Sequence, residues 1–308
     1  MYRWLVAWGV SLSIACYTQA NPITNGNITV NVSGTSGAIQ SLTFGGTEYY
    51  NRGTVYSHYG FQVVGNSASF AMAFASGGID VGLNITSVTS AGAGGPVTVT
   101  GAYQGISFTR VYSFVPGYDV LRITTTFTNP GNSPIAIHYF DTYDPDQGVD
   151  LVQGFSTYND VLVLSGMNVA QSSANASGSP GYTVIWGGPS HTVGFLNGIL
   201  GIFAATDLSN FLTNPLDPNG ALADIGMGIV YTLSLSPGQS LTIRYDQAFG
   251  RTPQAAQNAF QGANQQGGPG NGGGGGPGQD VIPEPTSIAL WSLLGLVGLG
   301  LRRSRWVS

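Results

Sequence analysis

The chain has 308 residues, of which 42% are hydrophobic and only 7% are charged, and 47 of them are glycine. So few charges exclude a coiled coil and the highly charged kind of disorder, and this much glycine argues against a helical protein. All nine basic residues are arginines and the net charge is −5, so the basic surface that a nucleic acid needs is absent.

Residues 1–20 contain the three parts of a secretory signal peptide. Arg3 supplies the positive charge, residues 5–15 form the apolar stretch, and residues 18–20 provide a small-residue cleavage site. We therefore expect export with cleavage after Ala20. Acylation at Cys16 as a lipoprotein is the alternative, and it would anchor the protein by a lipid. Because Cys16 is the only cysteine, the mature body forms no disulfide.

Between the two ends of the chain, apolar and polar residues alternate in short runs bounded by Gly, Pro, Asn or Asp. In residues 120–128, Leu121, Ile123 and Phe127 share one face and the polar residues share the other, which is typical of a half-buried strand. Similar runs occur at 28–32, 38–44, 57–64, 69–75, 97–103, 106–115, 134–140, 182–186, 192–196, 199–205, 227–235 and 241–246. The pattern predicts an all-β fold, a large antiparallel β-sandwich over residues 21–250.

The body is predicted to end in one short helix over residues 251–265. Pro253 suits the first turn of a helix, and Ala256 and Phe260 lie on one apolar stripe. Residues 266–280 are dominated by glycine and cannot bury apolar surface, so we expect a flexible linker there.

Residues 281–308 combine a tripeptide, an apolar helix and a cluster of arginines. The tripeptide is Pro283-Glu284-Pro285, and residues 288–301 are apolar. About fourteen helical residues rise only about 21 Å, which is short of the roughly 30 Å hydrocarbon core of a bilayer. A transient membrane anchor is therefore expected. An ordinary C-terminal anchor, held by arginines on the inner side of the membrane, is the alternative.

These three parts, in this order, resemble the PEP-CTERM sorting signal. The resemblance implies that an exosortase, a membrane enzyme similar to a transpeptidase, recognises Pro283, Glu284 and Pro285 and removes the tail. It also implies that the protein is released from the cell envelope or re-attached at the cell surface, and that it is associated with extracellular polysaccharide.

The body resembles the galactose-mutarotase-like supersandwich over residues 22–250. Residues 110–117 followed by 121–130 are similar to the central strand pair of that fold, and residues 235–249 are similar to its closing strands. A mutarotase needs a general acid and a general base, usually His and Glu.

His138 lies in a run similar to the family's histidine-containing strand, but Glu48 is the only glutamate of the body. His58 and His191 lie in other predicted strands with no motif linking them. We therefore assign no catalytic residues and expect that the protein is not an enzyme.

An aspartate-rich segment is the strongest candidate for a binding site. Residues 141–150 contain Asp141, Asp144, Asp146 and Asp150, with Gly148 between the last two. Carboxylate and carbonyl oxygens at alternate loop positions are ligands for Ca²⁺, the one cofactor that the sequence suggests, although the spacing departs from an EF-hand. A turn in which aspartates cap backbone groups, and a loop that contacts sugar or protein, are the alternatives.

Tyrosines and threonines offer two further kinds of candidate surface. Tyrosines around the predicted strand ends could stack on sugars, but most are expected in the core. An ice-binding face needs a regular ladder of threonines, and residues 124–126 are one isolated run without an internal repeat.

We expect an exported, non-enzymatic protein of the cell surface or extracellular matrix, with an exosortase and extracellular polysaccharide as partners. One alternative is a carbohydrate-active enzyme of the supersandwich type, which would need a carboxylate opposite His138. Another alternative is an adhesin stabilised by calcium at Asp144 and Asp146.

Overall fold

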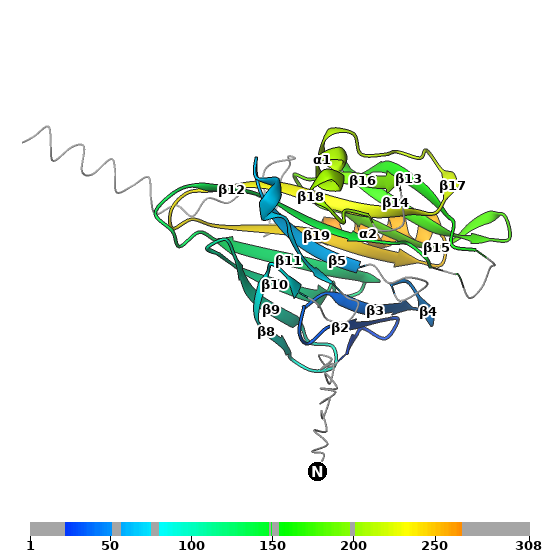
Figure 1. The fold of residues 1–308 in the computed structure, drawn as a ribbon. Helices are drawn as coiled ribbons and strands as arrows, with labels where there is room; N and C mark the ends of the chain where they lie inside the picture. Colours follow the sequence, from blue (N-terminus) through cyan, green and yellow to red (C-terminus); the bar gives the residue numbers. More distant parts are fainter. Residues whose placement is uncertain are drawn as a thin grey trace, which may run out of the picture. The chain divides into compact units, whose positions relative to one another are not determined.

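A computed structural model describes residues 22–50, 57–74, 80–147, 149, 154–197 and 201–266 (Figure 1). These residues form nineteen strands in three antiparallel sheets, with two α-helices and one 3-10 turn, η1 (Ser67–Ser69). The predicted all-β antiparallel sandwich is thus confirmed. The predicted signal peptide, the glycine-rich linker beyond Gln266 and the sorting signal with Pro283, Glu284 and Pro285 lie outside the described residues. No helix in the described ranges is long and apolar enough to cross a membrane.

The largest sheet has nine strands, and in it the strands predicted at 120–128 and 241–246 are neighbours. Ile123 lies opposite Tyr245, and both are fully buried. In spatial order the strands are β17 (Ala221–Ala223), β13 (Thr157–Leu164), β14 (Met167–Ala176), β15 (Ser179–Gly187), β19 (Ser240–Gly250), β11 (Val120–Thr128), β10 (Ile106–Phe114), β9 (Val97–Tyr103) and β8 (Asn84–Ser90).

The two smaller sheets close the sandwich. The six-stranded sheet contains β16 (Thr192–Asn197), β18 (Ile225–Leu235), β12 (Ile135–Tyr143), β5 (Ser57–Val63), β6 (Ala71–Phe74) and β7 (Asp80–Val81). The four-stranded sheet contains β1 (Ile23–Thr24), β2 (Ile28–Val32), β3 (Ile39–Phe44) and β4 (Thr47–Glu48).

The main core is built from the inward-facing side chains of all three sheets and is rich in aromatic rings. Phe61 of β5 lies at its centre, with its ring centroid 5.0 Å from that of Phe108 on β10 and 5.4 Å from that of Tyr139 on β12. Aromatic pairs at these separations stabilise a core beyond the apolar area that they bury.

The predicted C-terminal helix is present as α2 (Pro253–Gln266). It lies on the outer face of the nine-stranded sheet, where Ala256 and Phe260 pack in one cluster with Ile185 and Ala248. The apolar stripe that the sequence predicted is the face that contacts the sheet.

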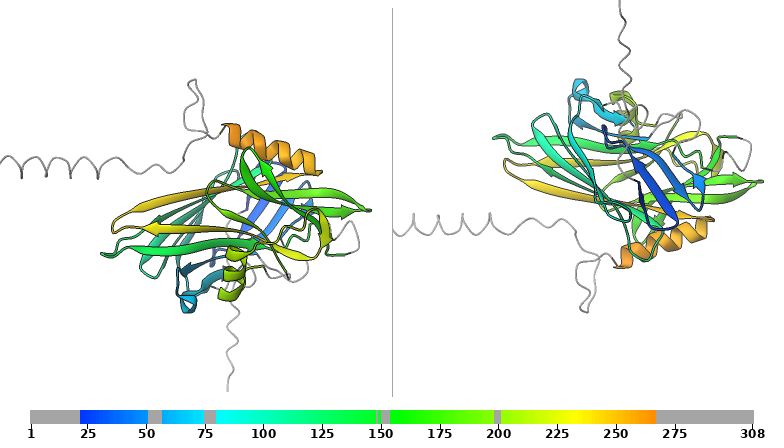
Figure 2. Two further views of the ribbon diagram at one scale, coloured as in Figure 1. Left: turned by 90° about the horizontal axis from the view of Figure 1, so that it is seen from above. Right: turned by 90° about the horizontal axis from the view of Figure 1, so that it is seen from below.

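A second helix, α1 (Ala205–Thr213), was not predicted, and the strand expected at 199–205 is wrong for residues 201–205. Leu208 and Phe211 of α1 pack in a cluster with Phe140 and Val230, on the outer face of the six-stranded sheet. Covering this second apolar surface favours a helix here, because an amphipathic helix buries one stripe and leaves the other exposed. The two helices lie on opposite sides of the sandwich (Figure 2).

Candidate metal centre and hydroxyl face

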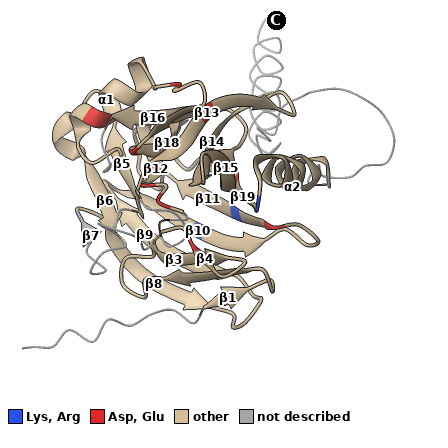
Figure 3. Cartoon of the chain, turned by 90° about the vertical axis from the view of Figure 1, so that its right-hand side faces the viewer, with Lys and Arg blue, Asp and Glu red and all other residues tan. Residues whose placement is uncertain are grey.

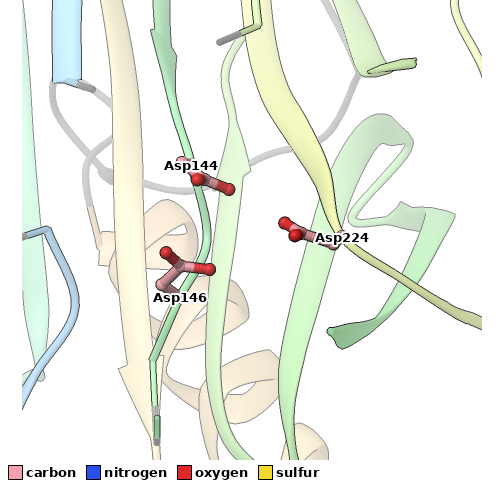
Figure 4. A group of neighbouring side chains, drawn as sticks. All are labelled: Asp144, Asp146 and Asp224. Atoms are coloured by element: carbon pink, nitrogen blue, oxygen red, sulfur yellow. The ribbon is translucent and has the colours of Figure 1, made fainter. Parts of the chain in front are cut away.

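Three aspartates meet where β12 ends and β18 begins. Tyr143, the last residue of β12, pairs with Met227 of β18. Residues just after β12 therefore lie beside residues just before β18. One carboxylate oxygen from each of Asp144, Asp146 and Asp224 lies within 4.8 Å of the other two, and Figure 4 shows the three side chains converging. We call these three residues the aspartate cluster.

The aspartate cluster combines two buried carboxyl groups with one exposed carboxyl group. Asp144 is 6% exposed and Asp146 is 2% exposed, whereas Asp224 is exposed. Burial, together with the charge of the neighbouring aspartates, raises the pKa of Asp144 to about 8 and that of Asp146 to about 7. The Oδ1 atoms of Asp144 and Asp146 are both buried and accept no hydrogen bond.

Of the four aspartates that the sequence suggested as calcium ligands, the structure brings Asp144 and Asp146 together. Asp150 lies outside the described residues. Asp141 does not join them, because it belongs to β12 and its side chain is paired in the core with Arg110 of β10. Asp224 was missed by the sequence analysis, because a pattern within one segment cannot show which distant residue a strand pairing will place beside it.

Asp141 belongs to a polar network inside the core. Its carboxylate accepts hydrogen bonds from Nη2 of Arg110 and from the hydroxyl of Tyr245. The Arg110 guanidinium also lies 4.5 Å from the ring centroid of Tyr59, and its Nε donates to the hydroxyl of Tyr112 at 2.8 Å. This network satisfies a buried charge pair, and nothing in it is open to a ligand.

His138 makes no pair with a carboxylate in the part of the chain that the structure describes. Its Nδ1 lies 3.0 Å from Oγ1 of Thr232 on the neighbouring strand, and partial burial lowers its pKa. Glu48 is used elsewhere, since its Oε1 accepts backbone N–H groups from Leu42 and Tyr50 at 2.9 Å each. The acid and base that a mutarotase needs are therefore not assembled by these two residues.

The other two histidines bind backbone carbonyl oxygens. Nε2 of His58 lies 2.6 Å from the oxygen of Ile202, and full burial lowers the His58 pKa to about 4. Nε2 of His191 lies 2.9 Å from the oxygen of Asn168. In these contacts each of the three histidines has a different partner, and none of them contacts another histidine.

Several tyrosines that could have stacked on sugars are core residues, as expected. Tyr50 stacks on Tyr143 at 4.4 Å between ring centroids, and Tyr143 stacks on Trp186 at 5.0 Å. All three side chains are buried. The Tyr143 hydroxyl is buried without a hydrogen-bond partner, and its pKa is raised by burial and by nearby Tyr49, Asp144 and Asp146.

The outer face of the nine-stranded sheet carries rows of hydroxyl groups where α2 does not cover it. One row crosses five strands, because the pairings of β8, β9, β10, β11 and β19 place one hydroxyl residue of each strand side by side. The residues of this row are Ser87, Thr100, Thr109, Thr126 and Thr242. Neighbouring hydroxyls bond to each other, as between Thr126 and Thr242 at 2.8 Å.

We define the hydroxyl face as this row together with six further outward-facing Ser and Thr residues of the same five strands. The additional members are Thr89, Thr98, Ser107, Thr124, Thr128 and Ser240. β8 and β9 contain no charged residue (Figure 3). The sequence analysis saw an isolated threonine run at 124–126. The rows became visible only with the strand pairing, and Thr125 is not part of them because it is fully buried.

No protein-family model matches the sequence, and no curated protein matches it. Among solved structures, the chain is similar to a bacterial glucoamylase complexed with acarbose, with a TM-score of 0.54 and 11% identity over 81% of this chain and 35% of the other. A polysaccharide lyase matches with a TM-score of 0.46 and 11% identity, over 78% of this chain and 35% of the other. A galactose mutarotase-like protein from Lactobacillus casei matches with a TM-score of 0.44 and 10% identity, over 76% of this chain and 100% of the other.

This chain therefore spans about a third of the length of the glucoamylase and of the lyase. At such low identity these similarities concern the fold alone, which is a large antiparallel sandwich.

Proposed function

We propose that this protein is an exported, non-enzymatic protein of the cell surface or matrix that binds neutral extracellular polysaccharide through its hydroxyl face. The observation that carries the proposal is the continuous row of hydroxyls over five strands. Each hydroxyl can donate and accept hydrogen bonds, as the hydroxyls of a polysaccharide do. Removing water from neutral hydroxyls also costs far less than removing it from charges.

The two ends of the chain support a location outside the cell. The signal peptide at residues 1–20 directs export, and the tail at 281–308 resembles a PEP-CTERM signal that an exosortase would process. The apolar helix of the tail would hold the protein at the membrane until that processing. The scarcity of charge in the body, where all basic residues are arginines, suits a neutral ligand better than an anionic one.

Co-sedimentation with insoluble polysaccharides tests the proposal. The purified protein is mixed with a neutral glucan such as cellulose, or with chitin, and the bound fraction is measured at low salt and at 0.5 M NaCl. We expect binding that high salt leaves unchanged, because salt screens interactions between charges and the hydroxyl face has few of them. The double variant Thr109→Glu/Thr126→Glu puts two negative charges into the row. Because removing water from these charges is costly, the variant should not bind.

Ser209→Glu is the matched control. Ser209 is exposed on α1, on the opposite side of the sandwich, so its variant adds a charge of the same kind and should bind like the unchanged protein. Equal binding by the double variant would refute the assignment of the hydroxyl face, and binding that salt abolishes would refute a neutral ligand. If no polysaccharide binds but the protein causes thermal hysteresis in freezing solutions, the ordered hydroxyls bind ice instead.

A further inference from the structure

We infer that the aspartate cluster, Asp144, Asp146 and Asp224, is a binding site for a calcium ion at the seam between the two large sheets. This inference is independent of the hydroxyl face and of the proposed polysaccharide ligand. Three observations point to the ion: the spacing of the three carboxylates, the buried and unpartnered Oδ1 atoms of two of them, and their position in the chain.

The spacing of the carboxylates suits one ion. Oxygen ligands lie 2.3–2.6 Å from Ca²⁺, so two oxygens on opposite sides of the ion are about 5 Å apart at most. Three oxygens of the cluster, one from each carboxylate, lie within 4.8 Å of one another. The donor set contains oxygen and neither sulfur nor imidazole nitrogen, and such a set favours a hard cation over zinc or copper.

One carboxylate oxygen of each buried member has no hydrogen-bond partner. Oδ1 of Asp144 and Oδ1 of Asp146 are shielded from solvent and accept no hydrogen bond. Within the described part of the chain, Arg110 pairs with Asp141 and Arg122 pairs with Asp246, so these two arginines neutralise other aspartates. A buried carboxylate oxygen without a hydrogen-bond donor or a counter-ion is unfavourable. A bound cation supplies both the positive charge and the missing coordination.

The position of the cluster indicates that the ion would stabilise the fold. Asp144 and Asp146 follow β12 of the six-stranded sheet. Asp224 is the residue between β17, at the edge of the nine-stranded sheet, and β18 of the six-stranded sheet. An ion held by all three joins the end of one strand to the crossover between the sheets, and therefore stabilises the edge formed by β13 and β17.

The test uses the full-length protein freed of metal by a chelator and then titrated with CaCl₂ or MgCl₂ in a calorimeter. We expect one calcium ion per chain, with a dissociation constant in the range of extracellular sites, on the order of 10⁻⁴–10⁻³ M. Terbium, which replaces calcium and is excited through nearby aromatic rings, provides a second readout. Tyr143 is the adjacent residue and stacks on Trp186, so terbium emission should appear on excitation of the aromatic rings.

Asp224→Asn is the decisive variant because Asp224 is exposed, so the change should leave folding intact while it weakens calcium binding at least tenfold. Asp146→Asn changes a buried ligand and should also weaken calcium binding at least tenfold. Asp160→Asn removes one charge from neighbouring β13, outside the cluster, and should bind normally. The inference is overturned if the unchanged protein binds no calcium up to 10 mM, or if Asp224→Asn and Asp146→Asn bind as tightly as Asp160→Asn. Equal affinity for magnesium would overturn the assignment to calcium.

Discussion

The buried pair between Arg110 and Asp141 gives the sharpest prediction about stability. Arg110 is 1% exposed and Asp141 is 2% exposed, and they join β10 of one sheet to β12 of the other. Replacing Arg110 by methionine keeps an unbranched side chain of similar length but removes the positive charge. Asp141 then retains the Tyr245 hydroxyl as a donor and loses its counter-ion.

Breaking a buried ion pair by removing one partner typically costs about 3–5 kcal/mol, because the other charge stays buried and unpaired. The free energy of unfolding of a domain is about 5–15 kcal/mol, so the Arg110→Met variant should lose a large part of its stability. Burial already raises the pKa of Asp141, and loss of Arg110 raises it further. The folded variant then binds a proton that the unfolded chain releases above pH about 4. Its deficit should therefore grow as the pH rises from 4.5 to 8.

Urea unfolding followed by aromatic fluorescence measures this deficit. The matched variant is Arg110→Met/Asp141→Asn, in which no charge remains in the core, and it should recover most of the lost stability at pH 8. A loss below about 1 kcal/mol for Arg110→Met, or a double variant as unstable as the single one, would refute the assignment of this network as a charge-paired core element.

Three further predictions concern other parts of the chain. The pKa of buried His58 is about 4, so the unfolded chain binds more protons than the folded protein between pH about 6.5 and 4, and the contribution of His58 to stability is lost as the pH falls through that window. The melting temperature should therefore fall more steeply between pH 7 and 4.5 than in His58→Gln, and equal slopes would contradict this. In Gly250→Ala the new Cβ would lie 2.3 Å from the backbone nitrogen of Ala256, so α2 should be displaced and cut by protease faster than in the unchanged protein; unaltered cleavage would argue against tight docking. Glu284→Ala should leave the C-terminal tail on the exported protein, as read from its intact mass, and a tail removed as efficiently as before would speak against the sorting motif.

The alternation of residues was sufficient to predict most strands and the faces that they bury. Leu121, Ile123 and Phe127 point into the core and Thr124 and Thr126 point outward, as the pattern indicated. This works because successive side chains of a strand point to opposite faces, so the burial of one face appears as a period of two within a few residues.

The strands that the sequence missed lack this local signal. In β14 the buried positions include Gln171, Ser172 and Ser173. Gln147 donates to the backbone oxygen of Ser172, and Thr183 donates to the hydroxyl of Ser173. Polar residues whose hydrogen bonds come from other segments can be buried without an apolar pattern. Their burial is therefore decided by tertiary partners.

The sequence by itself determined the fold class, the C-terminal helix of the body and the residue types at the aspartate-rich segment. The tertiary structure alone decided which of these residues form sites. Asp141 faces the core and pairs with Arg110, Asp224 is placed beside Asp144 by the pairing of β12 with β18, and the hydroxyl rows arise from the register of five strands. The physical reason is that strand register is fixed by long-range pairing, which brings distant residues together and leaves no trace in the local pattern.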